Sequence, residues 1–329
     1  MASEQEQGRI HGRLAAILAW KPPPWATAVL ALALIVGAWW LIYSEFHSHS
    51  LNDIWSAVLQ LRKKLITEAA LFVGLSFLAL ILDEYLSLHL MGVPKRFFSM
   101  LAPAYTTYSL ANALSFSFAT APAVRTRLYR DMLQPIEIGT LSAVTGASVF
   151  VGATTTTGLG LLMGADEIAA TGHITPLIWQ AIGAALLIPA AIWIMQSFGP
   201  RHSLSMFGVT ITTPGSVRAA AQLIVAVAGW VFAAAVLYEL LPGHGGWSFP
   251  AFAAAFVGAC YVGAASGAPA GLGVFDAAIL SISLADEHAP ATAAALIIYR
   301  LIYTVAPLAL GAFILGQDLL LSRGKRSAP

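Results

Sequence analysis

Long apolar stretches recur along the whole chain, and short polar segments separate them. An α-helix needs roughly 20 residues to cross the hydrocarbon core of a bilayer, and the longer stretches have about this length. The pattern predicts an all-α polytopic membrane protein of about seven to eight spans, with two broken or re-entrant helical elements in addition. The expected continuous spans are 25–44, 65–91, 137–163, 176–198, 218–241, 248–265 and 290–320.

Two apolar stretches carry features that do not suit a helix facing lipid. Residues Ser266–Asp276 read S-G-A-P-A-G-L-G-V-F-D, and both Gly and Pro interrupt helices. Residues 97–122 are laced with hydroxyl and amide side chains, among them Asn112. Such groups are tolerated at membrane depth only inside protein or beside a wet cavity. We therefore expect broken elements at 97–122 and 266–285. Paired interruptions point to a transporter binding site, and the sequence leaves open whether these two are related by symmetry.

The composition agrees with a membrane protein. Of the 329 residues, 58% are hydrophobic and 10% are charged, whereas a soluble domain carries about 25% charged residues. The net charge is +1 and the basic residues are scattered, which argues against a nucleic-acid partner. A single cysteine, Cys260, excludes an internal disulfide. We expect one transmembrane domain, 25–320, between cytoplasmic tails at 1–24 and 321–329, with no cleaved signal peptide.

The distribution of Lys and Arg predicts the orientation, because the cytoplasmic segments of membrane proteins are enriched in both. With both termini in the cytoplasm, 13 of the 17 basic residues fall on cytoplasmic segments. The cluster Arg62–Lys64 falls on the outer side, and Arg300 falls within the membrane.

Arg300 is the first candidate for chemistry, because it lies inside the apolar run I-I-Y-R-L-I-Y-T between Tyr299 and Tyr303. A charge at the centre of a bilayer costs about 2.5–3.5 kcal/mol on insertion scales, so the side chain needs a partner or water. One interpretation is an ion pair with Asp276. Another is a phosphate clamp, since a guanidinium binds phosphate oxygens through two hydrogen bonds. The two are compatible, and a third interpretation lets the side chain reach an interface.

Asp276 follows the glycine-rich break and begins a half-helix. It could cap that helix, pair with Arg300, or accept a cationic headgroup. The free N–H groups at such a helix start, beside Gly271 and Gly273, attract anions. The site could then hold both charges of a zwitterionic headgroup.

Further candidates lie on the earlier elements. At least one of Asp83 and Glu84 should point inward from its helix, where it could meet an amino group; otherwise they reach Lys95, Arg96 or Arg125 at the inner interface. The basic residues after 97–122 satisfy the positive-inside rule and could also gather anionic headgroups. The candidate substrate-binding residues are Arg300, Asp276, Asp83, Glu84, Asn112, Arg125, Arg127, Gly271, Gly273, Tyr299 and Tyr303.

Enzyme motifs fail on inspection. Gly263–Gly267 is only faintly similar to an intramembrane serine-protease motif, and no histidine falls inside a later span. The sequence has no metal cluster, phosphate loop or nucleotide fingerprint, so we expect no enzyme activity and no cofactor. Without an ATP site, transport would draw on a gradient or run downhill.

Three stretches together resemble the transmembrane flippase domain of the lysyl-phosphatidylglycerol synthase (multiple peptide resistance factor) family. They are 109–129, with A-P-A-V-R-T-R-L-Y at its end; A-P-A-G-L-G-V-F-D at 268–276; and I-Y-R-L-I-Y at 298–303. The chain departs from that family at Ala270, where Gly is usual, at Asp276, where Glu is usual, and at Ala121-Pro122, which replaces a Gly pair. The family's aminoacyl-transferase domain is not expected here.

The resemblance implies a transporter that moves an amphiphilic phospho- or aminoacyl-lipid between the leaflets of a bacterial cytoplasmic (inner) membrane. Arg300 would hold the headgroup phosphate, and Asp276 with Asp83 or Glu84 would meet an amino group. The implied partner is a membrane lipid, and self-association stays open. The alternative is a membrane subunit that transports nothing and that docks or regulates a separate lipid-modifying synthase.

Overall fold

The computed structural model describes residues 63–114, 117–170, 172, 174–195, 198, 203–206, 209–212, 216–266, 268–282 and 289–324. All of them belong to one compact unit, residues 44–329. The expected first span, 25–44, and the expected tail 1–24 lie outside the described residues.

Five helical stretches among the described residues are long and apolar enough to cross a membrane. The first four are α4 (Lys63–Leu90), α7 (Pro135–Met163), the pair α9 (Pro176–Leu186) and α10 (Ile188–Met195), and α11 (Ser216–Leu240). The last runs through α14 (Ala289–Tyr299), the π-helix η4 (Arg300–Val305) and α15 (Ala306–Gly324). The chain is therefore a helical protein with several apolar helices of membrane-spanning length, at five of the expected positions.

The expected span 248–265 corresponds to a shorter helix, α12 (Phe249–Ala265), of 17 residues. Two short elements, α8 (Ala165–Ala170) and the 3₁₀-helix η1 (Pro242–Gly246), lie in connections between the longer helices. Within the expected loop 199–217 the structure adds a small antiparallel hairpin, β1 (Ser203–Met206) with β2 (Val209–Thr212), in which Ser203 is opposite Thr212. Thr and Val favour strands, although the apolar pattern of the sequence predicts only a loop here.

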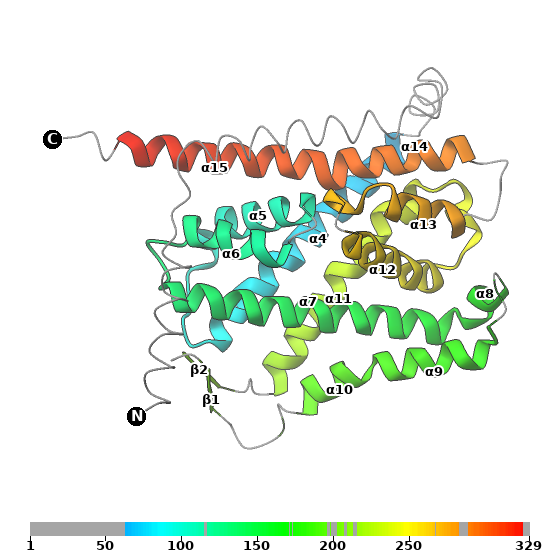
Figure 1. Ribbon diagram of the computed structural model, residues 1–329, viewed down its shortest axis with the longest axis horizontal. Coiled ribbons are helices and arrows are strands. Elements are labelled where there is room, and N and C mark those ends of the chain that lie inside the picture. The colour runs from blue at the N-terminus through cyan, green and yellow to red at the C-terminus, as the bar shows by residue number, and fades with distance from the viewer. Residues whose placement is uncertain are drawn as a thin grey trace, which may run out of the picture. The chain divides into compact units, whose positions relative to one another are not determined.

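Both expected interruptions are present as two helices on either side of a break. The first pair is α5 (Phe97–Ala113) and α6 (Ser117–Leu128). The second pair is α12 and α13 (Val274–Ile282), with the 3₁₀ turn η2 (Pro269–Gly271) between them. In Figure 1 the pair α5–α6 lies near the N-terminal end of α7, and the pair α12–α13 lies toward its other end.

The two pairs occupy matching places in two similar series of helices. One series is α4, α5–α6 and α7; the other is α11, α12–α13 and α14 to α15. α5 begins 34 residues after the start of α4, and α12 begins 33 residues after the start of α11. The closing helix begins after 72 residues in the first series and after 73 in the second. α9–α10 runs once between the two series, so α4 and α11 run in opposite directions (Figure 1).

Each interrupted pair also packs against the closing helix of the other series. α12 contacts α7, and α5 contacts α15. Glycines permit both approaches: a Cβ at Gly164, the residue that caps the end of α7, would lie 2.5 Å from the Cβ of Ala251, and one at Gly311 of α15 would collide with the Ser109 hydroxyl. α4 and α11, the first helices of the two series, pack against each other. Small residues allow this close packing, which is typical of helices in membranes.

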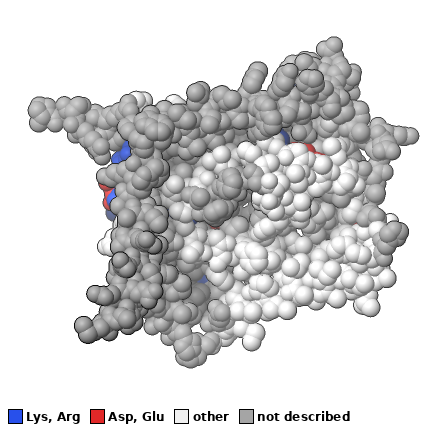
Figure 2. Space-filling view, viewed as in Figure 1, with Lys and Arg blue, Asp and Glu red and all other residues white. Residues whose placement is uncertain are grey.

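The outer surface over these helices is largely uncharged. In Figure 2 the visible face over α7, α9 and α12 is almost entirely white, with the few charged side chains near its edges. Large apolar side chains are exposed along α7 and α9–α10, for example Met163, Leu177 and Met195. An apolar surface this extensive is expected where a protein faces lipid.

Candidate functional site

The structure joins Arg300 and Asp276 in an ion pair with two-pronged geometry. Nη2 of Arg300 donates to Oδ2 of Asp276 at 2.8 Å and to Oδ1 at 3.0 Å, and Nε reaches Oδ1 at 3.3 Å. Nη1 donates to the carbonyl oxygen of Ala270 at 2.7 Å. The carboxylate is almost completely buried, while the Arg300 side chain keeps 16% of its surface exposed. Of the two first interpretations of Arg300, the ion pair is the one that the contacts display.

The backbone before Asp276 is shaped to bring these groups together. Ala270, Gly271 and Gly273 have positive φ values of 51°, 66° and 71°. This turn directs the Ala270 carbonyl toward the guanidinium. Asp276 is the third residue of α13, and its Oδ2 also accepts the Gly273 N–H at 3.1 Å. Asp276 therefore caps the start of α13 and pairs with Arg300 at the same time, which joins two of its expected roles.

Arg300 is the first residue of the π-helical turn η4. In this turn the N–H of Ala306 bonds to the carbonyl of Leu301. Pro307 follows at once, and a proline ring clashes with the carbonyl four residues earlier in an ordinary α-helix, so a widened turn at this place relieves it. Short π-helical turns are frequent at functional sites.

An aromatic wall surrounds the ion pair. The Arg300 guanidinium carbon lies 4.9 Å from the ring centre of Phe275, a cation–π distance. Tyr299 stacks between Phe275 and Tyr303, with ring centres 5.8 and 5.2 Å away. The Tyr303 hydroxyl lies 3.1 Å from the Ser76 hydroxyl on α4. The wall excludes water and strengthens the electrostatics of the pair.

A second buried ion pair holds Glu84 and Arg125. Nη2 and Nε of Arg125 donate to Oε2 of Glu84 at 2.5 and 3.2 Å. Tyr129 donates its hydroxyl proton to Oε1 at 2.6 Å. Arg125 also donates to the Ser142 hydroxyl at 3.0 Å and to the Tyr108 hydroxyl at 3.3 Å. All partners of the pair come from α4, α5, α6, α7 and the turn after α6, so this cluster fastens α6 to the neighbouring helices.

Asp83 lies beside this pair on α4 but has different partners. The Ser148 hydroxyl of α7 donates to its Oδ1 at 2.5 Å. Gln222 of α11 donates through Nε2 to the Ser87 hydroxyl at 2.9 Å and lies within reach of the Asp83 carboxyl. Among the described residues, the other oxygens of these two side chains, Oδ2 of Asp83 and Oε1 of Gln222, are buried without a hydrogen-bond partner.

Asn112, at the end of α5, lies within reach of the Tyr303 hydroxyl beside the Arg300 cluster, and its buried Nδ2 has no hydrogen-bond partner in the described part of the chain. The remaining candidates lie elsewhere. Arg127 pairs with Asp318 of α15 at 2.8 Å, and Arg130 pairs with the same carboxylate at 3.3 Å. These pairs are partly exposed. The structure therefore divides the candidates into an Arg300 cluster, a Glu84–Arg125 cluster, the isolated Asp83 and a peripheral group.

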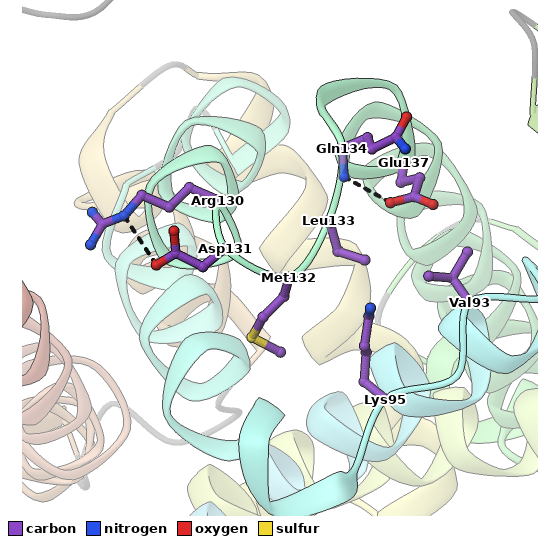
Figure 3. A pocket seen from close by; sticks show the side chains of 8 residues that line it. All are labelled: Val93, Lys95, Arg130, Asp131, Met132, Leu133, Gln134 and Glu137. Carbon is purple, nitrogen blue, oxygen red and sulfur yellow. Dashed lines mark hydrogen bonds and ion pairs between the residues drawn. The ribbon is translucent and has the colours of Figure 1, made fainter.

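A shallow pocket lies at the turn between α6 and α7. Its volume is about 380 Å³, and Lys95 extends into it from the α4–α5 connection (Figure 3). Arg130 and Asp131 face each other on one side, while Glu137 bonds the backbone N–H of Gln134 on the other. Its lining holds two basic and two acidic side chains, so its charge does not favour an anion.

Several partners in these clusters escaped the sequence interpretation. Tyr129 is the last residue of the run R-T-R-L-Y, whose two arginines are the predicted candidates. Gln222 is a lone amide in the apolar stretch 218–241. A single amide inside a span needs a partner, so that signal was available. Nothing local distinguishes Ser142 or Ser148 from other hydroxyls on α7.

Comparison with known proteins finds a similar protein but indicates no activity. No protein-family model matches the chain. The curated "Uncharacterized protein slr0712" of Synechocystis sp. is 26% identical over 313 residues, which cover 93% of this chain and 95% of that protein. The similarity thus extends over nearly the full length of both chains.

Proposed function

We propose that this protein moves an amphiphilic lipid between the leaflets of a bacterial cytoplasmic membrane. One observation carries the proposal: two interrupted helix pairs occupy matching places in two oppositely directed series, and a buried ion pair fastens each to a neighbouring long helix. Those ion pairs are Arg125–Glu84 for α6 and Asp276–Arg300 for α13. Paired interrupted helices in inverted repeats are the architecture in which transporters build their binding sites.

The opposite placement of the two pairs provides one adjustable element for each leaflet. In this mechanism α5–α6 enters from the cytoplasmic side and α12–α13 from the outer side, with both chain termini in the cytoplasm. The expected span 25–44 would add a sixth crossing to the five long helical stretches, while α12, at the expected span 248–265, would form the first half of the outer re-entrant element. Breaking one ion pair at a time would open the headgroup path to one leaflet while the other pair keeps the second leaflet closed.

Arg300 is the ligand that we assign to a headgroup phosphate. Asp276 and Ala270 account for four of the five N–H bonds that a guanidinium can make, and the Arg300 side chain remains partly exposed. A phosphate can therefore begin to bind at Nη1 and then compete with Asp276. Once displaced, the Asp276 carboxylate can accept a headgroup amino group. Glu84 is saturated by Arg125 and Tyr129, which leaves Asp276 as the better acid for that role.

The resemblance of three sequence stretches to the lysyl-phosphatidylglycerol flippase domain supports the same proposal. Two of those stretches supply the residues of the Arg300 cluster, which are far apart in sequence and adjacent in space. The phosphate contact and the absence of a synthase activity are part of the proposal.

The test is translocation of a fluorescent phosphatidylglycerol by the purified protein in phospholipid vesicles. Arg300→Gln alone leaves the Asp276 carboxylate buried without its partner, and Asp276→Asn alone leaves the guanidinium unpaired; either change can unfold the protein. The double variant Asp276→Asn/Arg300→Gln removes both charges together. We expect it to keep a thermal midpoint near that of the wild type and to lose translocation. Lys64→Gln, at an exposed position, is the control.

Two results would count against the proposal. Wild-type rates in the folded double variant would reduce the Arg300–Asp276 pair to a structural role. Absence of translocation by the wild type, together with co-purification of a soluble lipid-modifying enzyme, would favour the alternative of a docking or regulatory subunit.

A further inference from the structure

Asp83 is a buried acid without an ion-pair partner among the described residues. Only 1% of its surface is exposed, and it lies on a helix of membrane-spanning length. The Ser148 hydroxyl donates to Oδ1 of its carboxyl group, and the Gln222 side chain lies within reach, while Oδ2 has no hydrogen-bond partner among the described residues. An ionised carboxylate in such surroundings is costly unless it is paired or fully hydrogen-bonded.

The buried charged groups on the helices around Asp83 already have partners, and Arg218 of α11 lies at an exposed position. On α4 its neighbour is Glu84, and from α6 comes Arg125, whose charge Glu84 balances. From η4 comes Arg300, which pairs with Asp276. From α5 comes the neutral phenol of Tyr108, which accepts from Arg125. The elements in direct hydrogen-bonding reach, α7 and α11, contribute the uncharged Ser148 and Gln222. An ionised Asp83 would therefore leave one uncompensated negative charge in this region.

A proton removes this imbalance with the groups that are present. A protonated Asp83 is neutral, keeps the Oδ1 bond from Ser148, and gains one O–H donor at Oδ2. The buried Oε1 of Gln222 is an acceptor that lacks a donor, and it belongs to a side chain in reach of the same carboxyl group. A bound metal cation would instead need a shell of several oxygens, and the described residues hold no group of three His, Cys, Asp or Glu side chains that could provide one.

We propose that Asp83 is a proton-binding site, occupied in this conformation, through which a proton gradient acts on the protein. The binding step is simple: a proton from water joins the carboxylate, and the same proton leaves when water reaches it. Because Asp83 is adjacent to Glu84, losing that proton places a second negative charge beside the Glu84–Arg125 pair and competes for Arg125. The coupling of this event to lipid movement rests on the proposed function; the protonation does not.

Infrared spectroscopy of the full chain in lipid nanodiscs tests the proton site directly. We expect a carbonyl stretch of a protonated carboxylic acid at neutral pH that Asp83→Asn abolishes and that Asp131→Asn, at an exposed position, retains. Asn has the shape of the neutral acid, so Asp83→Asn should fold; if it does not, Ser148→Ala provides the second measurement. Losing that donor disfavours the ionised form, so the band should persist to higher pH. A spectrum without an Asp83-dependent band, or a band that Ser148→Ala does not move, would overturn the proposal.

A second measurement separates coupling from transport. In vesicles with an imposed pH gradient, translocation of fluorescent phosphatidylglycerol by the wild type should depend on the gradient, and Asp83→Asn should remove that dependence. Translocation that ignores the gradient in the wild type would refute the coupling and leave the transport function intact. If the wild type moves no lipid, the proposed function fails, and the infrared band still decides whether Asp83 holds a proton.

Discussion

Among single residues, Ala270 shows most clearly what the site demands of the chain. Its φ of 51° and ψ of 21° lie in the left-handed region, which costs a residue with a Cβ about 1–2 kcal/mol. This conformation directs the Ala270 carbonyl oxygen toward Arg300, from which it accepts a hydrogen bond at 2.7 Å. A Gly would adopt this left-handed backbone without that cost. Gly271 has a similar φ and in addition approaches the backbone of Gly263.

Ala270→Gly should therefore stabilise the protein. We expect a gain of up to about 1 kcal/mol, because relief of the left-handed strain exceeds the added flexibility of the unfolded chain. Gly271→Ala should lose about 1–2 kcal/mol or more, since its Cβ would also lie 3.0 Å from the Gly263 Cα. Thermal unfolding in one detergent compares both variants with the wild type. A lower midpoint for Ala270→Gly would mean that the turn needs the rigidity of a side chain.

On the scale of elements, the interrupted pairs depend on small residues where helices cross. A Cβ at Gly160 of α7 would collide with the Pro250 carbonyl of α12, which is backbone and cannot rotate away. At the matching crossing of α15 and α5, a Cβ at Gly311 would collide with the Ser109 hydroxyl, which is a side chain. The two crossings should respond differently to the same change.

Gly160→Ala should destabilise the protein by about 1–3 kcal/mol, the usual cost of overpacking. Gly311→Ala should also destabilise it. Adding Ser109→Ala to that variant should recover part of the loss, because it removes the hydroxyl that the new Cβ meets. Gly146→Ala is the matched control on α7, because a Cβ there meets nothing within 4 Å. Unfolding midpoints of the four variants provide the measurement. If Ser109→Ala gives no recovery, the α5–α15 crossing is not as close as the structure describes.

At the scale of the whole molecule, the two series of helices with opposite directions imply two sides with different loops. α7 runs from one side to the other. The turn before α7 carries Asp131 and the segment after it carries Asp166, and both residues are exposed. The basic residues Arg127 and Arg130 gather near the first end. The positive-inside rule predicts that this end faces the cytoplasm.

Single cysteines at these two positions test the orientation. In a background with Cys260→Ala, Asp166→Cys should react with a membrane-impermeant maleimide in intact spheroplasts. Asp131→Cys should react only after the membrane is disrupted. Both changes remove one acidic charge from an exposed site, so they control for each other. Reaction of Asp131→Cys in intact spheroplasts would invert the orientation and exchange the leaflets assigned to the two interrupted pairs.

The sequence by itself predicted five of the long helices and both interruptions, and it offered the Arg300–Asp276 ion pair as one of three interpretations. A helix in lipid must satisfy its backbone within itself, so length and apolar composition reveal it locally. The break at 266–276 is visible because Gly and Pro act on their own backbone. The ion pair between Arg300 and Asp276 was among the interpretations because the two are charged residues in neighbouring apolar segments. Each charge needs a partner there.

Only the tertiary structure decided which helical faces meet. Glu84 finds Arg125 across 41 residues, and Tyr129 completes the pair from the end of α6. Asp83, one position away, instead faces α7 and α11 and finds no cation. Adjacent residues on a helix diverge by about 100°, so their partners depend on which neighbours lie on each side. That arrangement comes from packing between distant segments, which no local pattern records.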